Sequence, residues 1–217
     1  MEHNAPVLYI ILQRKVEMIK KAIFGGTFDP IHNGHIQVAY EAMYKLKLDK
    51  VVFMPSGNPP HKQESKVTDS NIRCRLVEAA IQYEKNFEIS YYEVNKCELS
   101  YTYKTVKHFK QSEPNTEWYF IAGADCLIDI DNWYNIKGIL DYCNFVVFNR
   151  TEYNIEDVLI QKAKVENIYN KGIIFIDKHI LQISSTDIRN KIKNNISASY
   201  LVPHDAYKLI KKLNLYK

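Results

Sequence analysis

The sequence predicts an α/β fold in which an open parallel sheet carries helices on both faces. Of the 217 residues, 46% are hydrophobic and 25% are charged, which is the balance of a globular protein. After residue 18, short runs rich in Ile, Val and Phe alternate with longer amphipathic segments, as in successive strand–helix–strand units. The longest apolar run, residues 7–12, is far shorter than the roughly 18–20 residues that a membrane span needs. We therefore expect no membrane partner.

Six short apolar runs are the candidate strands. Their β-branched and aromatic residues favour strands, and turn-forming or charged residues bound each run. They lie at residues 22–24, 51–54, 87–90, 118–122, 145–148 and 173–176. Since helical segments separate them, we expect the strands to pair in parallel.

Six amphipathic segments are the candidate helices, with apolar residues near a period of 3.6 and lysines between them. They cover residues 34–46, 70–83, 101–110, 155–165, 186–193 and 204–213. Residues 68–70 and 184–186 offer hydroxyl or carboxylate caps before two of these segments. The alternation predicts a Rossmann-like sheet followed by a small C-terminal helical part.

The length favours one domain, which we expect to run from residue 18 to residue 217. Residues 1–17 fit the pattern poorly, whereas Met18 directly precedes a segment that reads as a first buried strand. Residues 1–17 are therefore predicted to be an N-terminal extension, either an upstream start or a flexible arm. The longest irregular segment, residues 55–67, contains three prolines, and long loops in compact domains tend to be functional.

Charge and cysteine content restrict the class of protein. The 29 Lys and Arg residues and 25 Asp and Glu residues give a net charge of +4, which suits anionic ligands such as nucleotides but is too mild to imply nucleic-acid binding. Cys74, Cys97, Cys126 and Cys143 form no CxxC pair, and no secretory leader precedes them. We expect a cytoplasmic protein with reduced cysteines and no nucleic-acid partner, rather than a disulfide framework or a zinc site.

The segment GGTFDPIHNGH, residues 25–35, is the most informative stretch. It follows a predicted strand and enters a predicted helix, the place where open α/β sheets bind ligands and where helix N–H groups attract anions. Gly25 and Gly26 allow the backbone to approach a phosphate. His32 and His35, three residues apart, can face one pocket. Zinc binding is the alternative, although no HExxH spacing or third ligand is evident.

A second candidate anion site lies near the end of the chain. Ser184, Ser185 and Thr186 precede a helix with Arg189 in its first turn. Hydroxyls, helix N–H groups and a guanidinium can all bind phosphate, although an ordinary capped helix would carry similar residues. Two anion sites without a candidate nucleophile suit direct displacement at phosphorus, where the protein positions the reactants and neutralises charge.

Two further features follow the fourth predicted strand. Asp125, just after Gly123, can accept hydrogen bonds from a ribose or cap the helix that follows. Trp133 and Tyr134 stand among asparagine and aspartate residues, which favours a stacking platform for a ring. The alternative is that these aromatic side chains cover an edge of the sheet.

These motifs resemble a known family. GGTFDPIHNGH resembles the signature of the nucleotidyltransferase superfamily whose hallmark is [HT]xGH, and ISSTDIR at residues 183–189 resembles its second motif. PPHK at residues 59–62, SYT at 100–102, GAD at 123–125 and the Trp-Tyr pair fall in the order found in bacterial nicotinate-nucleotide adenylyltransferases. The resemblance covers roughly Met18 to the end of the sequence.

The resemblance implies in-line attack by the 5′-phosphate of nicotinate mononucleotide on the α-phosphorus of ATP, releasing pyrophosphate. It implies catalytic roles for His32, His35 and Arg189. The implied ATP-binding residues are Gly25, Gly26, Thr27, Phe28, His32, His35, Gly123, Asp125, Ile183, Ser184, Ser185, Thr186 and Arg189. The implied residues for the mononucleotide are Lys62, Thr102, Trp133 and Tyr134. Mg²⁺ would accompany ATP as cofactor, held by phosphate oxygens with few dedicated protein ligands.

Two other functions remain open. The first is another HxGH nucleotidyltransferase, such as phosphopantetheine adenylyltransferase or glycerol-phosphate cytidylyltransferase, which chain length and the middle motifs disfavour. The second is a nucleotide-sensing module without catalysis, which the two intact motifs disfavour. The sequence leaves a homo-oligomer open.

Overall fold

The computed structural model describes residues 18–58, 67–96, 98–149, 153–178 and 180–217. The predicted extension at residues 1–17 and Lys62 lie outside the described residues. Six parallel strands form one sheet in the order β3-β2-β1-β4-β5-β6. They are β1 (Lys20–Gly26), β2 (Lys50–Pro55), β3 (Phe87–Ile89), β4 (Glu117–Gly123), β5 (Asn144–Phe148) and β6 (Ile173–Ile176). Each overlaps a predicted strand, so the predicted parallel sheet is confirmed.

Successive side chains of the central strands enter two separate cores. Ala22 and Phe24 of β1 pack in one core, whereas Ile23 between them packs in the other. This alternation follows from strand geometry, because neighbouring side chains point to opposite faces of a sheet. Both faces are therefore covered, which explains why the strands read as continuous apolar runs.

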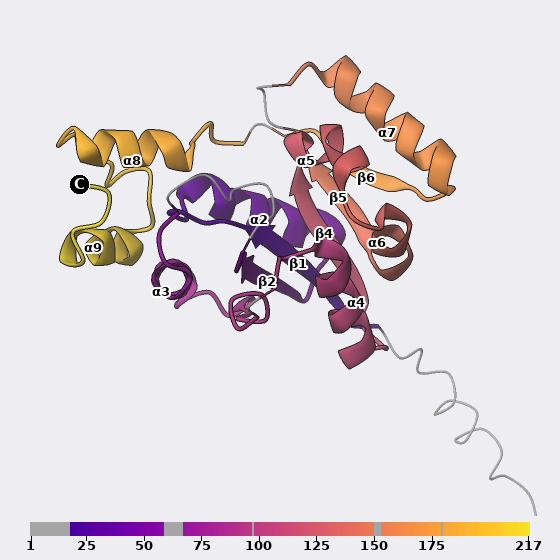
Figure 1. The fold of residues 1–217 in the computed structure, drawn as a ribbon, viewed down its shortest axis with the longest axis horizontal. Helices are drawn as coiled ribbons and strands as arrows, with labels where there is room; N and C mark the ends of the chain where they lie inside the picture. The colour runs from indigo at the N-terminus through magenta and orange to yellow at the C-terminus, as the bar shows by residue number, and fades with distance from the viewer. Residues whose placement is uncertain (1–17, 59–66, 97, 150–152, 179) are drawn as a thin grey trace, which may run out of the picture.

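Two groups of helices cover different faces of the sheet, one from the beginning and end of the chain and the other from its middle. One core is shared with α2 (Asn33–Leu46), α3 (Ser70–Ile81), α8 (Ser185–Lys193) and α9 (His204–Lys212). The other is shared with α4 (Thr102–Ser112), α5 (Ala124–Ile128), α6 (Ile136–Tyr142) and α7 (Ile155–Tyr169). Figure 1 shows α7 and the pair α8–α9 at opposite ends of the molecule. The predicted arrangement with helices on both faces is confirmed.

Three short helical elements were not among the predicted helices. They are α5, the 3-10 helix η2 (Ile130–Asn132) and α6. Helices of five and seven residues are too short to show a helical period clearly. Asn135 begins α6 with φ 55°, and its side chain accepts a hydrogen bond from the Gly138 N–H at 3.0 Å. A local cap therefore fixes the start of this helix.

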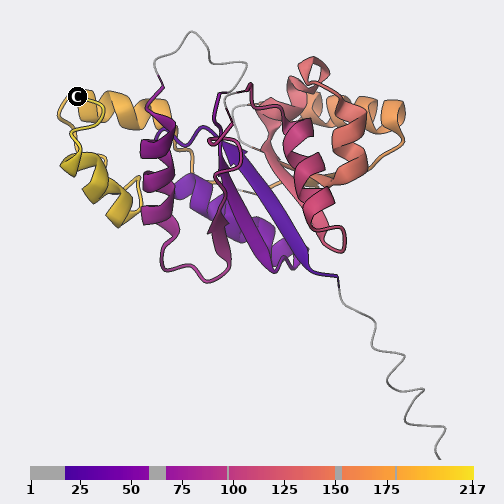
Figure 2. The ribbon, with the colours of Figure 1, turned by 60° about the horizontal axis from the view of Figure 1, so that its bottom comes forward.

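The small C-terminal helical part packs on the outer side of α3. Figure 2 shows α9 beside α3, and the Gln82 amide donates to the Asp205 carboxylate at 2.9 Å. The chain therefore folds back so that its last helices lie near the loops that follow β1 and β2.

Among the described residues, the helices lack the combination of length and apolar character that a membrane crossing requires.

Candidate active site

The candidate site lies at the carboxyl ends of β1 and β4. These two strands are neighbours, and the chain builds the sheet outward from them in opposite directions. Such a switch point is where open α/β sheets bind ligands. Gly25 and Gly26 end β1, and Gly123 ends β4 and caps α5. The sequence motifs at residues 25–35 and 123–125 therefore meet at one edge of the sheet.

The glycine pair is required by close contacts. A Cβ atom on Gly26 would lie 2.9 Å from the Phe28 ring, and one on Gly25 would lie 3.3 Å from the Phe120 ring. Phe28 has φ 50°, a left-handed conformation that brings its ring back under Gly26. The whole residue is only 2% exposed. The ring of Phe28 therefore supports the glycine pair from below.

His32 and His35 face each other at the start of α2. Their rings stack with centroids 3.6 Å apart, and the His32 N–H donates to Nδ1 of His35 at 3.2 Å. Since Nδ1 of His35 accepts this bond, a neutral ring carries its proton on Nε2 and donates from there. Phe28 supports His35 edge-on, with ring centroids 5.0 Å apart. The backbone thus sets the tautomer and orientation of His35.

Gly34 between the two histidines allows the second motif to approach. A Cβ atom there would lie 3.0 Å from the Leu181 carbonyl oxygen and 3.1 Å from Nδ1 of His32. The Leu181 N–H donates to the side chain of Gln37 at 2.8 Å. The segment that leads into ISSTDIR therefore runs directly over the start of α2.

The two predicted anion sites are joined by hydrogen bonds. Arg189 donates from Nη1 to the Asp29 carbonyl at 2.7 Å and from Nη2 to Thr186 Oγ1 at 3.1 Å. The Ser185 hydroxyl donates to the Pro30 carbonyl at 2.9 Å. The bond from Arg189 to Asp29 and the bond from Ser185 to Pro30 join residues that lie 160 and 155 positions apart in the sequence. The motifs at residues 25–35 and 183–189 therefore form one site.

Ser184 also serves as an ordinary helix cap. Its hydroxyl accepts the Asp187 N–H at 3.0 Å at the start of α8. Ile183 is half-buried against the core, and its N–H donates to the Leu181 carbonyl at 2.9 Å. The structure thus shows a capped helix, and the same turn is hydrogen-bonded to the loop after β1.

Sequence reasoning missed the buried Arg73, which joins the connection after β1 to the connection between β2 and α3. Its guanidinium donates to the carbonyls of Thr27, Ser56 and Thr68 at 2.6, 2.7 and 2.9 Å. Burial lowers the pKa of Arg73, while the charge of nearby Asp29 opposes this change. An arginine is rarely buried without such partners. The available signal was its place on the face of α3 that also carries Leu76 and Val77.

Ser100, beside the predicted residue Thr102, links this region to the start of α4. Its hydroxyl oxygen accepts the N–H groups of Gly57 and Asn58, both at 3.2 Å. Behind it, Thr105 donates to the Glu93 carboxylate at 2.6 Å. Burial raises the pKa of Glu93, and hydrogen bonds from Thr105 and Ser100 counteract that rise. Thr102 is the first residue of α4 and is half-buried.

The predicted aromatic pair divides between core and surface. Trp133 is half-buried, with its ring edge-on to Phe120 and Phe145 at centroid distances of 6.3 and 6.0 Å. Tyr134 is 56% exposed, and the centroid of its ring lies 5.3 Å from that of the Tyr101 ring. Trp133 therefore partly covers the sheet, as the alternative interpretation held, while Tyr134 presents an aromatic surface beside the start of α4.

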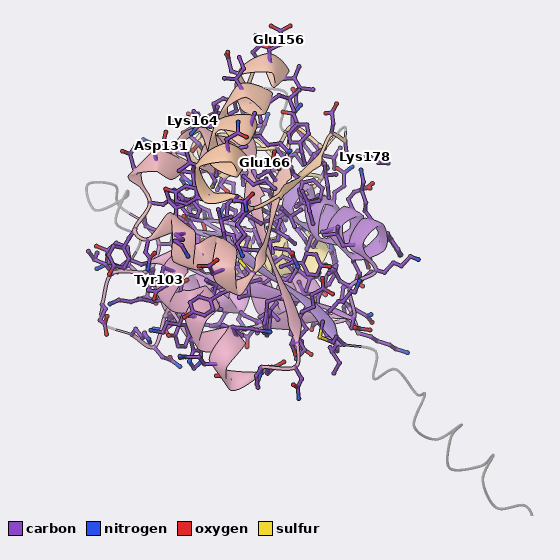
Figure 3. All side chains as sticks on the ribbon, turned by 90° about the vertical axis from the view of Figure 1, so that its right-hand side faces the viewer. Tyr103, Asp131, Glu156, Lys164, Glu166 and Lys178 are labelled. Atoms are coloured by element: carbon purple, nitrogen blue, oxygen red, sulfur yellow. The ribbon has the colours of Figure 1, made fainter. Side chains whose placement is uncertain are left out.

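The turn that carries Trp133 is fixed from behind by α7. Figure 3 shows Asp131 and Lys164 close together, and their charged atoms lie 2.6 Å apart. Gln161 donates to the same carboxylate at 3.0 Å. The hydrogen bond from Lys164 lowers the pKa of Asp131, with Gln161 adding to the effect. This exposed ion pair joins η2 to α7.

One ring separates the glycine loop from the aromatic pair. Phe120 of β4 lies against Gly25 on one side and Trp133 on the other. Asp125 is exposed in the first turn of α5, directly after β4. A ligand bound along the carboxyl edge of the sheet can therefore reach both regions.

The side chains of this site form no evident metal cage. Among the described residues, no group of three or more His, Cys, Asp or Glu could hold a metal ion. Within the same residues, Cys74, Cys126 and Cys143 form no disulfide. The paired histidines thus gain no third ligand from the described part of the chain.

Comparison with known proteins gives concordant matches in sequence and structure. A family model described as cytidylyltransferase-like matches residues 23–191. Relatives from Clostridium novyi and Clostridium kluyveri, each named "Probable nicotinate-nucleotide adenylyltransferase", are 59% and 52% identical over 200 and 206 residues. In both cases 92% of this chain matches 100% of the relative.

Solved structures show the same fold at much lower sequence identity. The nicotinic acid mononucleotide adenylyltransferase of Plasmodium falciparum complexed with NaAD matches with a TM-score of 0.74 and 20% identity. The match covers 91% of this chain and 97% of that chain.

Proposed function

Because the chain belongs to the nicotinate-nucleotide adenylyltransferases of the cytidylyltransferase-like family, we propose that it transfers the adenylyl group of ATP to nicotinate mononucleotide. The products are nicotinate adenine dinucleotide and pyrophosphate, and the reaction is a step of NAD biosynthesis. The observation that carries the proposal is the 2.7 Å contact between Arg189 and the Asp29 carbonyl, which joins the two anion-binding motifs.

The triphosphate of ATP would lie over the glycine loop and the start of α2. Gly25 and Gly26 leave room for phosphate oxygens, and the first turn of α2 offers N–H groups and a partial positive charge. Thr27 and Phe28 contribute backbone, and the Ser184–Thr186 turn with Ile183 approaches from α8. Arg189 would add a guanidinium that can form two hydrogen bonds to phosphate.

The chemical step would be a direct displacement. An oxygen of the mononucleotide 5′-phosphate attacks the α-phosphorus of ATP, and the bond between that phosphorus and its β-bridging oxygen breaks. Pyrophosphate leaves with the electron pair of the broken bond. His32, His35 and Arg189 stabilise the charge that develops on the phosphate oxygens, with His35 donating from Nε2. No covalent intermediate with the protein is required.

The mononucleotide would occupy the region between α4 and η2. Trp133 and Tyr134 would stack on the pyridine ring, and Thr102 would contribute its hydroxyl or its helix N–H group. Backbone N–H groups would bind the carboxylate of nicotinate. Asp125, at the end of β4, would accept hydrogen bonds from the adenosine ribose next to Gly123. Lys62, which lies outside the described residues, is proposed to contact phosphate.

A divalent metal ion fits this site as a companion of ATP. The family to which the chain belongs implies such an ion, and the described residues supply no cluster of three or more ligating side chains. We propose Mg²⁺, which would be held by phosphate oxygens and water and would neutralise phosphate charge. Every protein role above is independent of a protein-bound metal.

The proposal also covers the location of the protein in the cell and the extent of its catalytic domain. We place the protein in the cytoplasm, where ATP and reduced cysteines coexist, and we assign residues 18–217 to one catalytic domain. The relatives support this assignment because 92% of the chain matches their whole length. The +4 net charge suits nucleotide substrates, and we propose no nucleic-acid partner.

Product analysis tests the proposed function. The full chain is incubated with ATP, Mg²⁺ and either nicotinate mononucleotide or nicotinamide mononucleotide, and the products are identified by mass spectrometry. We expect nicotinate adenine dinucleotide and an equal amount of pyrophosphate. ATP binding without any dinucleotide would favour a nucleotide-sensing module, and turnover of phosphopantetheine in its place would favour another nucleotidyltransferase.

A further inference from the structure

Tyr216, which follows α9, reaches back to the loop that follows β1. Its hydroxyl donates to Oδ1 of Asp29 at 2.7 Å, across a separation of 187 positions. Its backbone has φ 63°, a left-handed conformation that is costly for an aromatic residue. Such a conformation persists only where surrounding contacts determine it. The contact with Asp29 is therefore part of the packed structure rather than a casual surface interaction.

Asp29 needs this donor because its side chain is buried. The residue is 5% exposed, and its other oxygen accepts the Thr68 N–H at 3.2 Å. A buried carboxylate is stable only where hydrogen bonds replace its lost water. Tyr216 and Thr68 thus hold the side chain of Asp29 from two different segments of the chain.

The backbone of Asp29 supports the proposed phosphate machinery. Its carbonyl accepts Nη1 of Arg189 at 2.7 Å, and the next carbonyl, that of Pro30, accepts the Ser185 hydroxyl at 2.9 Å. Two residues later, His32 begins α2. The position of Asp29 therefore determines where Arg189 and the start of α2 lie.

We propose that Tyr216 is a positioning residue for the phosphate-binding loop, acting through Asp29 on Arg189. The inference rests on the proposed adenylyl transfer and adds a residue to it that neither sequence motif contains. Tyr216 itself lies behind the loop and touches no reacting atom in this scheme. Its hydroxyl fixes the Asp29 side chain, and the Asp29 carbonyl then fixes the guanidinium.

The electrostatic environment keeps the hydroxyl in its donating form. Burial and the neighbouring Asp29 carboxylate raise the pKa of Tyr216. The phenol therefore stays protonated throughout the range in which an adenylyltransferase would be assayed. The interaction is a constant structural restraint rather than a pH switch.

Tyr216→Phe tests the inference, because it removes the hydroxyl and keeps the ring. We expect kcat/KM for ATP to fall about tenfold, the usual scale for losing one donor to a buried charged group. The KM for nicotinate mononucleotide should stay within about twofold, because the lost contact lies on the ATP side. Calorimetric binding of a non-hydrolysable ATP analogue should weaken in parallel.

Tyr40→Phe is the matched control. The Tyr40 hydroxyl also donates to a carboxylate, that of Glu84, and its ring packs on Phe87 at the opposite end of the sheet from the site. The control loses the same type of bond, so it reports general destabilisation. We expect its kinetic constants to equal those of the wild type. An equal loss of ATP affinity in both variants, or wild-type behaviour of Tyr216→Phe, would overturn the inference.

A double-mutant cycle with Asp29→Asn tests the route of the effect. If Tyr216 acts through Asp29, the double variant should be no worse than Asp29→Asn alone. Multiplication of the two single effects would contradict that route. If Asp29→Asn does not fold, the comparison of Tyr216→Phe with Tyr40→Phe still decides. Dinucleotide formation by the wild type tests the proposed function separately, whereas binding of the analogue tests Tyr216 without turnover.

Discussion

The two halves of the candidate site are built from different kinds of side chain. The half proposed to bind phosphate, here the phosphate half, lies around the loop after β1 and is held by buried hydrogen-bonding groups, with Arg73 2% and Asp29 5% exposed. The half proposed to bind the pyridine ring, here the pyridine half, lies around η2 and the start of α4 and is lined by aromatic rings, with Tyr134 56% exposed. Its supporting ion pair between Asp131 and Lys164 lies at the surface.

This difference matches the demands of the two substrates. Charge that develops on a phosphate is stabilised most by donors already fixed in place, because no reorganisation is then needed during reaction. An aromatic ring needs mainly a surface of suitable shape, and stacking tolerates small displacements. We therefore expect changes in the phosphate half to affect stability and kcat, and changes in the pyridine half to affect binding of one substrate.

The largest expected effect concerns the phosphate half and its stability. Arg73→Leu leaves the half-buried carbonyls of Thr27, Ser56 and Thr68 without their donor. At the lower end of the penalty for an unsatisfied group, about 1 kcal/mol for each carbonyl, the free energy of unfolding should fall by roughly 3 kcal/mol. Denaturant titration measures it. Arg75→Leu on the exposed side of α3 is the control, and an equal loss in both variants would break the comparison.

The next effect is on chemistry. His35→Ala should lower kcat about 10²-fold or more, because it removes a fixed donor from the developing charge. Steady-state kinetics and thermal unfolding are measured together, so that a folding defect is recognised. His204→Ala, at an exposed position on α9, serves as the control. A kcat near the wild-type value would remove His35 from the mechanism.

The pyridine half should determine the choice between acid and amide. A pocket of N–H donors binds the nicotinate carboxylate and leaves the NH₂ of nicotinamide facing donors. Mispairing of a buried polar group typically costs about 1–3 kcal/mol, so kcat/KM should favour the nicotinate form by roughly ten- to a hundredfold. Parallel assays with the two mononucleotides measure the ratio, and equal values would refute this specificity.

The smallest expected effect lies outside both halves. Removal of residues 1–17 should leave kcat, both KM values and the melting temperature close to those of the full chain, with kinetic changes within about twofold. The reason is that 92% of the chain matches the entire length of its Clostridium relatives. A marked loss of activity would show that the single domain does not begin at residue 18.

Local features of the fold were predictable, whereas its tertiary contacts were not. The run at residues 118–122 predicts β4 because its apolar, aromatic residues end abruptly at glycine. The HxGH segment likewise carries its own meaning, since strand end, glycines and helix start are adjacent. Arg73 and Tyr216 gave no comparable signal, because their partners lie 46 and 187 positions away. The supporting roles of Arg73 and Tyr216 were therefore identified only from the folded structure.

The aromatic pair illustrates an intermediate case. Its polar neighbours predict a stacking platform for a ring. Tyr134 is exposed, whereas Trp133 packs on Phe120 and Phe145. The sequence could not distinguish the two rings, because η2 and α6 on either side are too short to reveal which way each residue faces.

Calorimetric binding to two variants tests the division of the site most directly. Arg189→Ala should weaken a non-hydrolysable ATP analogue about tenfold by loss of a charged donor, and Trp133→Ala should weaken nicotinate mononucleotide about tenfold by loss of stacking. Each variant should bind the other ligand within about twofold of the wild type. Equal weakening of both ligands by both variants would show one indivisible pocket and contradict the account.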